Sequence, residues 1–294
     1  MTAETKAIVN EVETSIAQIA SELPGRPGVV VRFLADDLEI RFNADERFAA
    51  ASVIKVAIMA EVYRQEDVGA LHLNETLVLD AADVTEGAGV LQYLHAGLQL
   101  SIADAMELMI SLSDNTATNM VLRRVGTDSV NDAMKSLGLT NTVLGGLFGR
   151  ARPANLRHRV SETSPHDMAV LLTAIAGSQC VNAGACASML RHLEHVIHQD
   201  VLPRYLPLTP HPERLGYPGL AVMIAHKSGS LTGVRHDVGI ITIETGAGKY
   251  QTIVSAFTDH LEDDDLWTPE NVGERTLAEL GKLIFDAMVR MSQR

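Results

Sequence analysis

Cysteine is scarce in this chain, whose 294 residues include only Cys180 and Cys186. A disulfide framework needs more cysteines in a smaller chain, and no C-x-x-C pair suited to zinc or redox chemistry is present. We therefore expect two reduced, half-buried thiols in a stretch that is otherwise predicted to be helical. The chain is long enough to bury a hydrophobic core without cross-links.

Positive charge is also in short supply. The sequence has 24 Lys and Arg residues against 37 Asp and Glu residues, which gives a formal net charge of −13. An acidic chain of this kind does not attract phosphate backbones or anionic lipids. Nucleic acids and membrane surfaces are therefore not expected partners.

Long apolar runs are missing as well. No uncharged apolar stretch reaches the roughly 18 residues that cross a membrane. The N-terminal region contains Glu4, Glu11 and Glu13 where a signal peptide has its apolar core. The sequence as written predicts a cytoplasmic protein, or a periplasmic or secreted one if a leader has been removed.

The sequence does show a clear order of secondary-structure patterns. Helical periodicity over 5–23 precedes two predicted strands at 28–34 and 38–42. Helical patterns, the first of them at 53–64, then dominate as far as about residue 212. Three β-rich runs and a final amphipathic helix follow, at 221–226, 236–244, 250–258 and 272–291.

Strands at both ends, with helices between them, predict an α+β fold. We expect an antiparallel sheet flanked by the N- and C-terminal helices, with an inserted all-helical lobe. Residues 1–50 and 216–294 would form the discontinuous α/β lobe, and residues 51–215 the helical lobe. The crevice between two such lobes is a common place for a binding site.

Ser52 and Lys55 stand at the start of the predicted helix 53–64. A spacing of three places the Lys55 amine on the same helix face as the Ser52 hydroxyl. Burial lowers the pKa of an amine, which can then take the hydroxyl proton, and an N–H at a helix N-terminus can stabilise an oxyanion. The pair is a candidate nucleophile and base, although most serines followed by such a lysine are ordinary surface residues.

Two further motifs follow in order. Ser113-Asp114-Asn115 begins another predicted helix and supplies a second hydroxyl for proton relay and an amide that can hold a carbonyl. Lys227-Ser228-Gly229 comes at the end of a predicted strand. Its cation and hydroxyl suit a carboxylate, and its glycine lets a ligand approach the strand backbone.

The three motifs in this order resemble the serine β-lactamase and penicillin-binding protein superfamily, and most closely the class A β-lactamase-like serine hydrolases. The likeness covers nearly the whole chain and is densest over 51–59, 112–119 and 226–230. It implies the two-lobed α+β fold and catalysis without metal or cofactor. The expected partner is a small-molecule β-lactam or another amide or ester substrate.

The resemblance also implies a role for each motif residue. Ser52 would be the acylated nucleophile and Lys55 its activating partner, while Ser113 would relay a proton to the leaving nitrogen. The substrate would be held by the remaining residues: Asn115 at its amide, Lys227 and Ser228 at its carboxylate, Gly229 along the strand, and Ser230 through the second oxyanion-hole N–H. Aligning Asp237 with an acidic residue of the family places Arg235 as a further carboxylate anchor.

One family feature is missing. Class A enzymes carry a glutamate in the loop after the second motif, and that glutamate is accepted as the deacylation base. When the proline of this loop is aligned with that of the family, Arg152 falls near the glutamate position. Glu162 is the one carboxylate in the stretch 150–165. Glu162 is a candidate base, but its place beside the next predicted helix, 165–176, favours an interaction with the helix dipole.

The activity depends on this base, because a positioned general base contributes about 10²–10⁴-fold in rate. A β-lactamase is the leading prediction. The alternatives are a related D,D-peptidase, esterase or transacylase, or a β-lactam-binding protein with slow deacylation.

Histidines form one more candidate site. His192, His195 and His198 have a spacing that can share a metal ion on a helix. The H-E-x-x-H order is absent, and no fourth ligand is evident. A solvated helix face is the favoured interpretation, so no metal is expected.

Overall fold

The computed structural model describes residues 3–149, 161–262 and 267–293. Its centre is a five-stranded antiparallel sheet with the strand order β2-β1-β10-β9-β8. The bounds of these strands are β1 Arg26–Phe33, β2 Leu38–Phe42, β8 Ala221–Leu231, β9 Val234–Thr245 and β10 Gly248–Asp259. All five predicted strands are therefore present.

Strand β8 extends five residues beyond its predicted end at 226. Its pairing with β9 continues from Lys227 opposite Val238 to Leu231 opposite Val234. The polar motif residues keep the extended conformation because β9 offers backbone partners along this whole length. The third motif consequently lies inside a rigid strand and not at its end.

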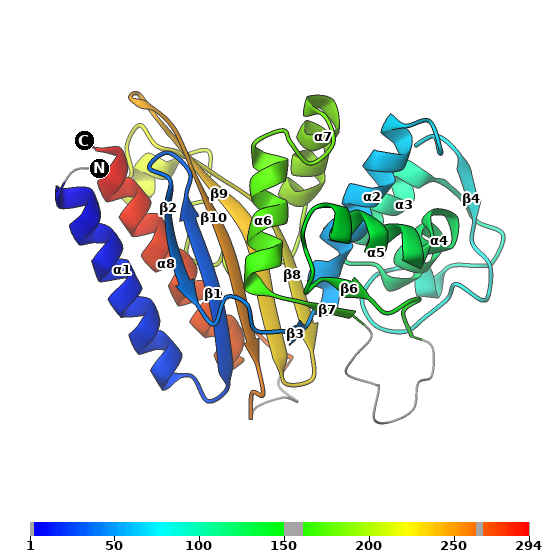
Figure 1. The fold of residues 1–294 in the computed structure, drawn as a ribbon, viewed down its shortest axis with the longest axis horizontal. Helices are drawn as coiled ribbons and strands as arrows, with labels where there is room; N and C mark the ends of the chain where they lie inside the picture. The colour runs from blue at the N-terminus through cyan, green and yellow to red at the C-terminus, as the bar shows by residue number, and fades with distance from the viewer. Residues whose placement is uncertain (1–2, 150–160, 263–266, 294) are drawn as a thin grey trace.

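Helices cover both faces of the sheet (Figure 1). The terminal helices α1 (Ala3–Glu22) and α8 (Val272–Ser292) pack together on one face. On the other face, α6 (Pro165–Ala176) packs against β1, β9 and β10, and α7 (Ala183–Glu194) packs against β8. The predicted α+β class with flanking terminal helices is confirmed.

Each face of the sheet contributes to a separate hydrophobic core. Successive side chains of a strand point to opposite faces. Val30 and Ile253 belong to a core shared with α2 and α6, whereas Val31 and Val254 belong to a core beneath α1 and α8. The sheet is thus buried on both sides, which explains the near-continuous apolar runs of its central strands.

The inserted segment contains short strands as well as helices. Its helices are α2 Lys55–Asp67, α3 Ile102–Ser111, α4 Asn115–Val125 and α5 Thr127–Ser136, together with α6 and α7. β4 Thr76–Val78 pairs with β5 Gln99–Ser101, while β7 Ser161–Thr163 pairs with β3 Phe48–Ala49 and β6 Val143–Leu144. The segment 51–215, expected to be all-helical, thus also contains short strands that the sequence does not predict, because runs of two or three residues are too short to show a strand period. The lobe boundaries stay a prediction.

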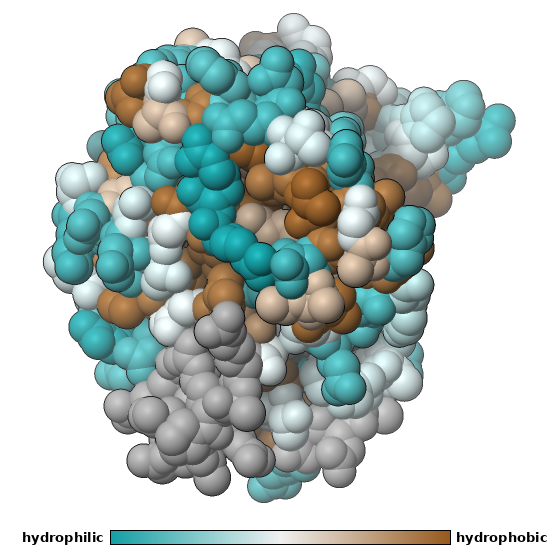
Figure 2. All heavy atoms as spheres, turned by 90° about the vertical axis from the view of Figure 1, so that its right-hand side faces the viewer, coloured by the Kyte–Doolittle hydropathy of each residue, from teal (hydrophilic) through white to brown (hydrophobic). Residues whose placement is uncertain are grey.

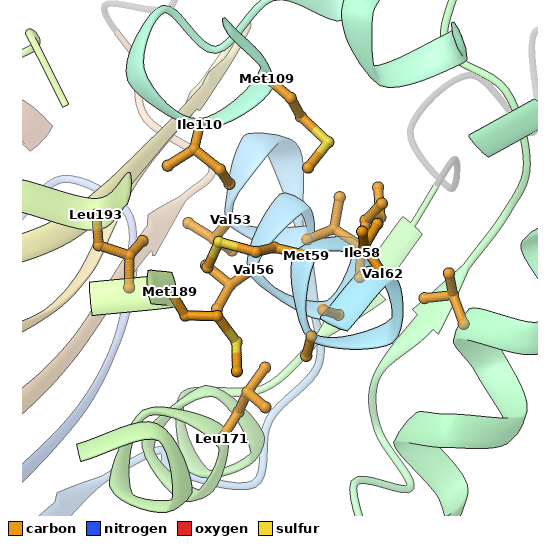
Figure 3. Close-up of a cluster of buried hydrophobic side chains, with 14 of the residues drawn as sticks. Val53, Val56, Ile58, Met59, Val62, Met109, Ile110, Leu171, Met189 and Leu193 are labelled. Carbon is orange, nitrogen blue, oxygen red and sulfur yellow. The ribbon is translucent and has the colours of Figure 1, made fainter. Parts of the chain in front are cut away.

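Helix α2 lies at the centre of the inserted segment. It packs against α3, α4, α5 and α7, and Figure 3 shows side chains from several elements around it. Val56, Ile58, Met59 and Val62 are fully buried within this cluster. A helix that is apolar around most of its surface needs such enclosure. This packing fixes the segment that carries Ser52 and Lys55.

The cysteines and histidines differ in part from expectation. Cys186 is buried in α7, but Cys180 is half-buried in the connection before it, and both are free thiols. α7 ends at Glu194, so His195 and His198 lie beyond the helix. His192 and His195 both contact the Glu107 carboxylate through Nδ1, and no group of three metal-ligating side chains is present among the described residues.

The surface at the end that carries β4 is mostly hydrophilic, with hydrophobic residues between (Figure 2). Exposed apolar residues are normal on a folded protein, because polar atoms alone do not cover its surface. No helix in the described part of the chain has the length and hydropathy needed to span a membrane.

Candidate active site

Ser52 lies in a short turn of 3-10 helix, η1 (Ala51–Ile54), that runs directly into α2. The preceding Ala51 has a left-handed backbone with φ of 46°, which is strained for a residue with a Cβ atom. The Ala50 N–H donates to the Ser161 carbonyl at 2.8 Å and ties the turn to β7. The strained turn is thus held between a buried helix and a strand.

A cavity of about 740 Å³ contains the half-buried Ser52 side chain. This volume is typical of small-molecule sites. Six of the predicted site residues line it, namely Ser52, Ser113, Asn115, Ser228, Gly229 and Ser230. The structure therefore brings the three motifs together, although they are far apart in sequence.

The Lys55 amine is fully buried and hydrogen-bonded to the second motif. Its Nζ lies 2.6 Å from the Ser113 carbonyl oxygen, 2.9 Å from Asn115 Oδ1 and 3.2 Å from Ser113 Oγ. The carbonyl and amide oxygens only accept hydrogen bonds, whereas the hydroxyl can also donate. A neutral amine can place its two N–H groups on the two acceptors and its lone pair toward the Ser113 hydroxyl, whereas an ammonium would donate to all three oxygens.

Electrostatics favour the same neutral form. Burial lowers the pKa of the Lys55 ammonium well below its usual range, and the charge of Lys227 adds to this effect, while the Asp114 carboxylate opposes it. The amine is thus a stronger candidate proton acceptor than an exposed lysine. In the described part of the chain the Ser52 hydroxyl makes no hydrogen bond, so the Ser113 hydroxyl is the bonded link between the amine and the cavity.

Asp114 fixes the second motif. Its buried carboxylate caps α4 by accepting the Ala117 N–H at 2.9 Å, and it also accepts the N–H groups of Val90 at 2.6 Å and Leu91 at 2.8 Å. Ser113, immediately before it, has a left-handed backbone with φ of 55°. The three bonds hold this strained turn, and the residues on either side of Asp114, Ser113 and Asn115, both line the cavity and bond to Lys55.

Lys227 is buried in β8, and its Nζ donates to the Ser228 carbonyl at 2.8 Å. Burial lowers the pKa of Lys227 to about 8, and the Asp237 carboxylate opposes this shift. Asp237 is itself held by a buried pair with His226, at 2.9 Å between Oδ1 and Nδ1. Lys227 does not itself line the cavity, although the next residue, Ser228, does, and a buried carboxylate on the neighbouring strand supports its charge.

Gly229 lets β8 lie directly against the Ser52 turn. A Cβ atom at this position would be 2.9 Å from the Ser52 nitrogen and 3.1 Å from the Val53 nitrogen. The first N–H groups of a helix have no acceptor within the helix. The absent side chain leaves the Ser52 N–H open to the cavity, beside Ser230, as an oxyanion hole requires.

Arg235 does not line the cavity. Its guanidinium is fully buried, with Nε 3.0 Å from Glu274 Oε1 and Nη1 2.8 Å from the carbonyls of Leu231 and Val234. It also lies 4.6 Å from the ring centre of Trp267. Glu274 and Trp267 do line the cavity. The role of Arg235 as a carboxylate anchor stays a prediction, because its guanidinium would have to leave these partners to reach a substrate.

Glu162 lies in β7, where its carboxylate is 3.5 Å from Arg47. Its neighbour Ser161 lines the cavity and Glu162 does not, as the alternation of a strand requires. The next helix, α6, starts at Pro165, is capped by Ser164 and has Asp167 in its first turn, so an interaction of Glu162 with this helix stays a prediction. Arg152 lies outside the described residues. Glu162 as a deacylation base stays a prediction.

Two residues near the site, the half-buried Phe148 and the buried His236, carry no signal in the sequence. Phe148 places its ring centre 5.0 Å from the Lys55 Nζ and also lines the cavity. His236 bonds through Nε2 to the Ala49 carbonyl at 2.8 Å, and burial lowers its pKa to about 4. The neutral imidazole thus ties β9 to β3, just before the Ser52 turn. Both contacts join segments far apart in the chain.

A buried amine linked to a cavity serine, a second serine beside it, and an open N–H at a helix start define a serine hydrolase of the β-lactamase type. Residues 11–288 match the model of the β-lactamase enzyme family. The chain belongs to this family, within the serine β-lactamase-like superfamily.

Relatives agree with this assignment. The chain is 30% identical to a β-lactamase of Citrobacter koseri over 139 residues, 47% of each chain. It spans about half the length of the curated relatives it matches. Among solved structures, the β-lactamase of Sphaerobacter thermophilus has a TM-score of 0.81 at 34% identity, covering 95% of this chain and 97% of that one.

A second kind of neighbour has the same fold. A mutant of PBP-A, solved as an acyl-enzyme complex with penicillin G, has a TM-score of 0.79 at 24% identity and covers 96% of this chain and 97% of that one. At this identity the likeness concerns the fold alone.

We expect Gly229→Ala to damage the site. The added Cβ would press on the Ser52 nitrogen, cost about 1–3 kcal/mol of unfolding free energy and abolish labelling of Ser52 by a fluorophosphonate probe. Gly246→Ala is the control, because a Cβ there meets nothing within 4 Å. Labelling of Gly229→Ala at the wild-type rate would contradict this account of the turn.

We also expect His236 to make stability depend on pH. The folded chain protonates His236 only near pH 4, whereas an unfolded histidine protonates near 6.5. The unfolded state therefore binds the extra proton in between, and stability falls as the pH is lowered through this window, by about 3 kcal/mol in full. Urea unfolding between pH 7.5 and 4.5 should show a shallower dependence for His236→Gln than for the wild type. Equal slopes would refute the assignment.

Proposed function

We propose that the protein is a class A-like serine β-lactamase that forms an acyl-enzyme on Ser52. The observation that carries the proposal is the buried Lys55 amine, whose three partners fit its neutral form and include a hydroxyl in the same cavity as Ser52. Family membership and the similarity to β-lactamases support the substrate class.

The first half of the reaction is opening of the lactam amide. Ser52 Oγ attacks the carbonyl carbon, and its proton passes to the Lys55 amine through the Ser113 hydroxyl. The N–H groups of Ser52 and Ser230 stabilise the oxyanion. The C–N bond then breaks, and Ser113 returns the proton from Lys55 to the leaving nitrogen, which yields an ester on Ser52.

Substrate binding follows from the same residues. Asn115 is oriented by accepting from Lys55 through Oδ1 and by donating to the Glu86 carbonyl at 3.3 Å through Nδ2. A second N–H of its amide group remains for a substrate carbonyl. Lys227, and the hydroxyl of Ser228 in the cavity wall, attract the substrate carboxylate.

The second half is hydrolysis of the ester by water. The carboxylates that line the cavity in the described part of the chain are Glu86, Asp200 and Glu274. No carboxylate among the described residues is hydrogen-bonded to Ser52, Lys55 or Ser113. This favours a second candidate function, a β-lactam-binding protein or transacylase of the same fold whose acyl-enzyme deacylates slowly.

We expect Ser52→Ala to lose all covalent chemistry with β-lactams. Intact-mass spectrometry after benzylpenicillin reports the acyl adduct, and a chromogenic cephalosporin reports turnover. The variant should form no adduct, and its turnover should fall to the uncatalysed rate. Ser21→Ala, an exposed change on α1, should behave as the wild type.

The same two measurements separate the candidate functions. Continuous colour from the wild type supports the β-lactamase, whereas a persistent adduct without turnover supports the slowly deacylating alternative. An adduct that survives Ser52→Ala would show that another residue is the nucleophile.

A further inference from the structure

Among the described residues, the hydrogen bonds of the Lys55 amine all go to the second motif, to two atoms of Ser113 and to Asn115 Oδ1. The ring of Phe148 lies 5.0 Å from the nitrogen. The aromatic ring has no titratable group and forms no strong hydrogen bonds, so a water molecule finds no hydrogen-bonding partner on it beside the amine.

Phe148 is held in this place by a buried side chain. Its N–H donates to Asn119 Oδ1 at 2.8 Å, and its carbonyl accepts from Asn119 Nδ2 at 3.2 Å. Asn119 is 2% exposed and also donates to the Asp83 carbonyl at 3.0 Å. Two hydrogen bonds from one side chain to the Phe148 backbone fix the position of Phe148. The contact of the ring with Lys55 is therefore built into the fold.

Phe148 also lines the cavity that contains Ser52. The same ring thus contacts both the amine and the space where an acyl group on Ser52 would lie. Hydrolysis of that ester needs a water molecule and a group that takes its proton. An apolar ring at this position leaves less room for that water molecule on the side of Lys55, the nearest candidate base.

We propose that Phe148 is a specificity-determining residue that excludes water from the Lys55 side of the acyl-enzyme and so prolongs its lifetime. This inference rests on the proposed acylation of Ser52 and concerns its second half only. Hydrolysis breaks the ester C–O bond, forms a C–O bond to water and returns a proton to Ser52 Oγ. Phe148 slows this step, which is measured separately from formation of the ester.

The test separates the two halves of the reaction. Acylation by benzylpenicillin is followed by stopped-flow or rapid-quench mass spectrometry, and decay of the isolated adduct is followed by intact mass. Phe148→Ala should shorten the adduct lifetime about 10–100-fold, and the acylation rate measured in parallel separates this effect from any change in ester formation. Phe148→Leu, which keeps an apolar group in place, should retain a lifetime near that of the wild type.

Controls exclude a general loss of structure. Phe42 on β2 is partly buried against the core beneath α1 and α8, so Phe42→Ala destabilises the fold away from the cavity. Its adduct should decay as in the wild type. If Phe148→Ala does not fold, Phe148→Gln provides a polar side chain of intermediate size and should also shorten the lifetime.

The outcomes are distinct. Equal adduct lifetimes in the wild type and in a folded Phe148→Ala or Phe148→Gln overturn the role of Phe148 and leave the proposed function standing. A wild type that hydrolyses the adduct faster than it can be detected also overturns it. A wild type that forms no adduct and shows no turnover overturns the proposed function, and with it this inference.

Discussion

The burial of one amine organises the active site. Lys55 sits at the first turn of α2 with no exposed surface, and among the described residues its nitrogen contacts the second motif and an aromatic ring. Removing a lysine charge from water costs several kcal/mol, and the neutral form avoids this cost. A neutral amine is a proton acceptor. The enclosure of α2 by four other helices therefore also favours the proton-accepting form of Lys55.

The rest of the fold holds the other reacting groups against this amine. Asp114 holds the turn that carries Ser113 through its hydrogen bonds, and the absence of a side chain at Gly229 lets β8 approach Ser52. Two of these turns contain left-handed residues, at Ala51 and Ser113. Strain of this kind persists only where surrounding structure over-determines the backbone. Two of the six non-glycine residues with positive φ in the described part of the chain thus stand at the turns that carry Ser52 and Ser113.

The sequence was informative where the chemistry is local. Ser52 and Lys55 are one helical turn apart, so their relation follows from helix geometry alone, and the amphipathic patterns predicted most of the large helices and strands. Contacts between distant segments could not be read in this way. The pairing of Arg235 with Glu274, the support of Lys227 by Asp237 and His226, and the extension of β8 all depend on which elements the topology places side by side.

The pKa of Lys55 tests the account most directly. The lysine Cε resonances of ¹³C-labelled protein can be titrated by NMR, with Lys55→Met to assign the Lys55 signal. We predict a midpoint for Lys55 well below the ordinary lysine value of 10.5. A midpoint at that ordinary value would mean that Lys55 is charged at neutral pH, and its proposed role as the base that activates Ser52 would be contradicted.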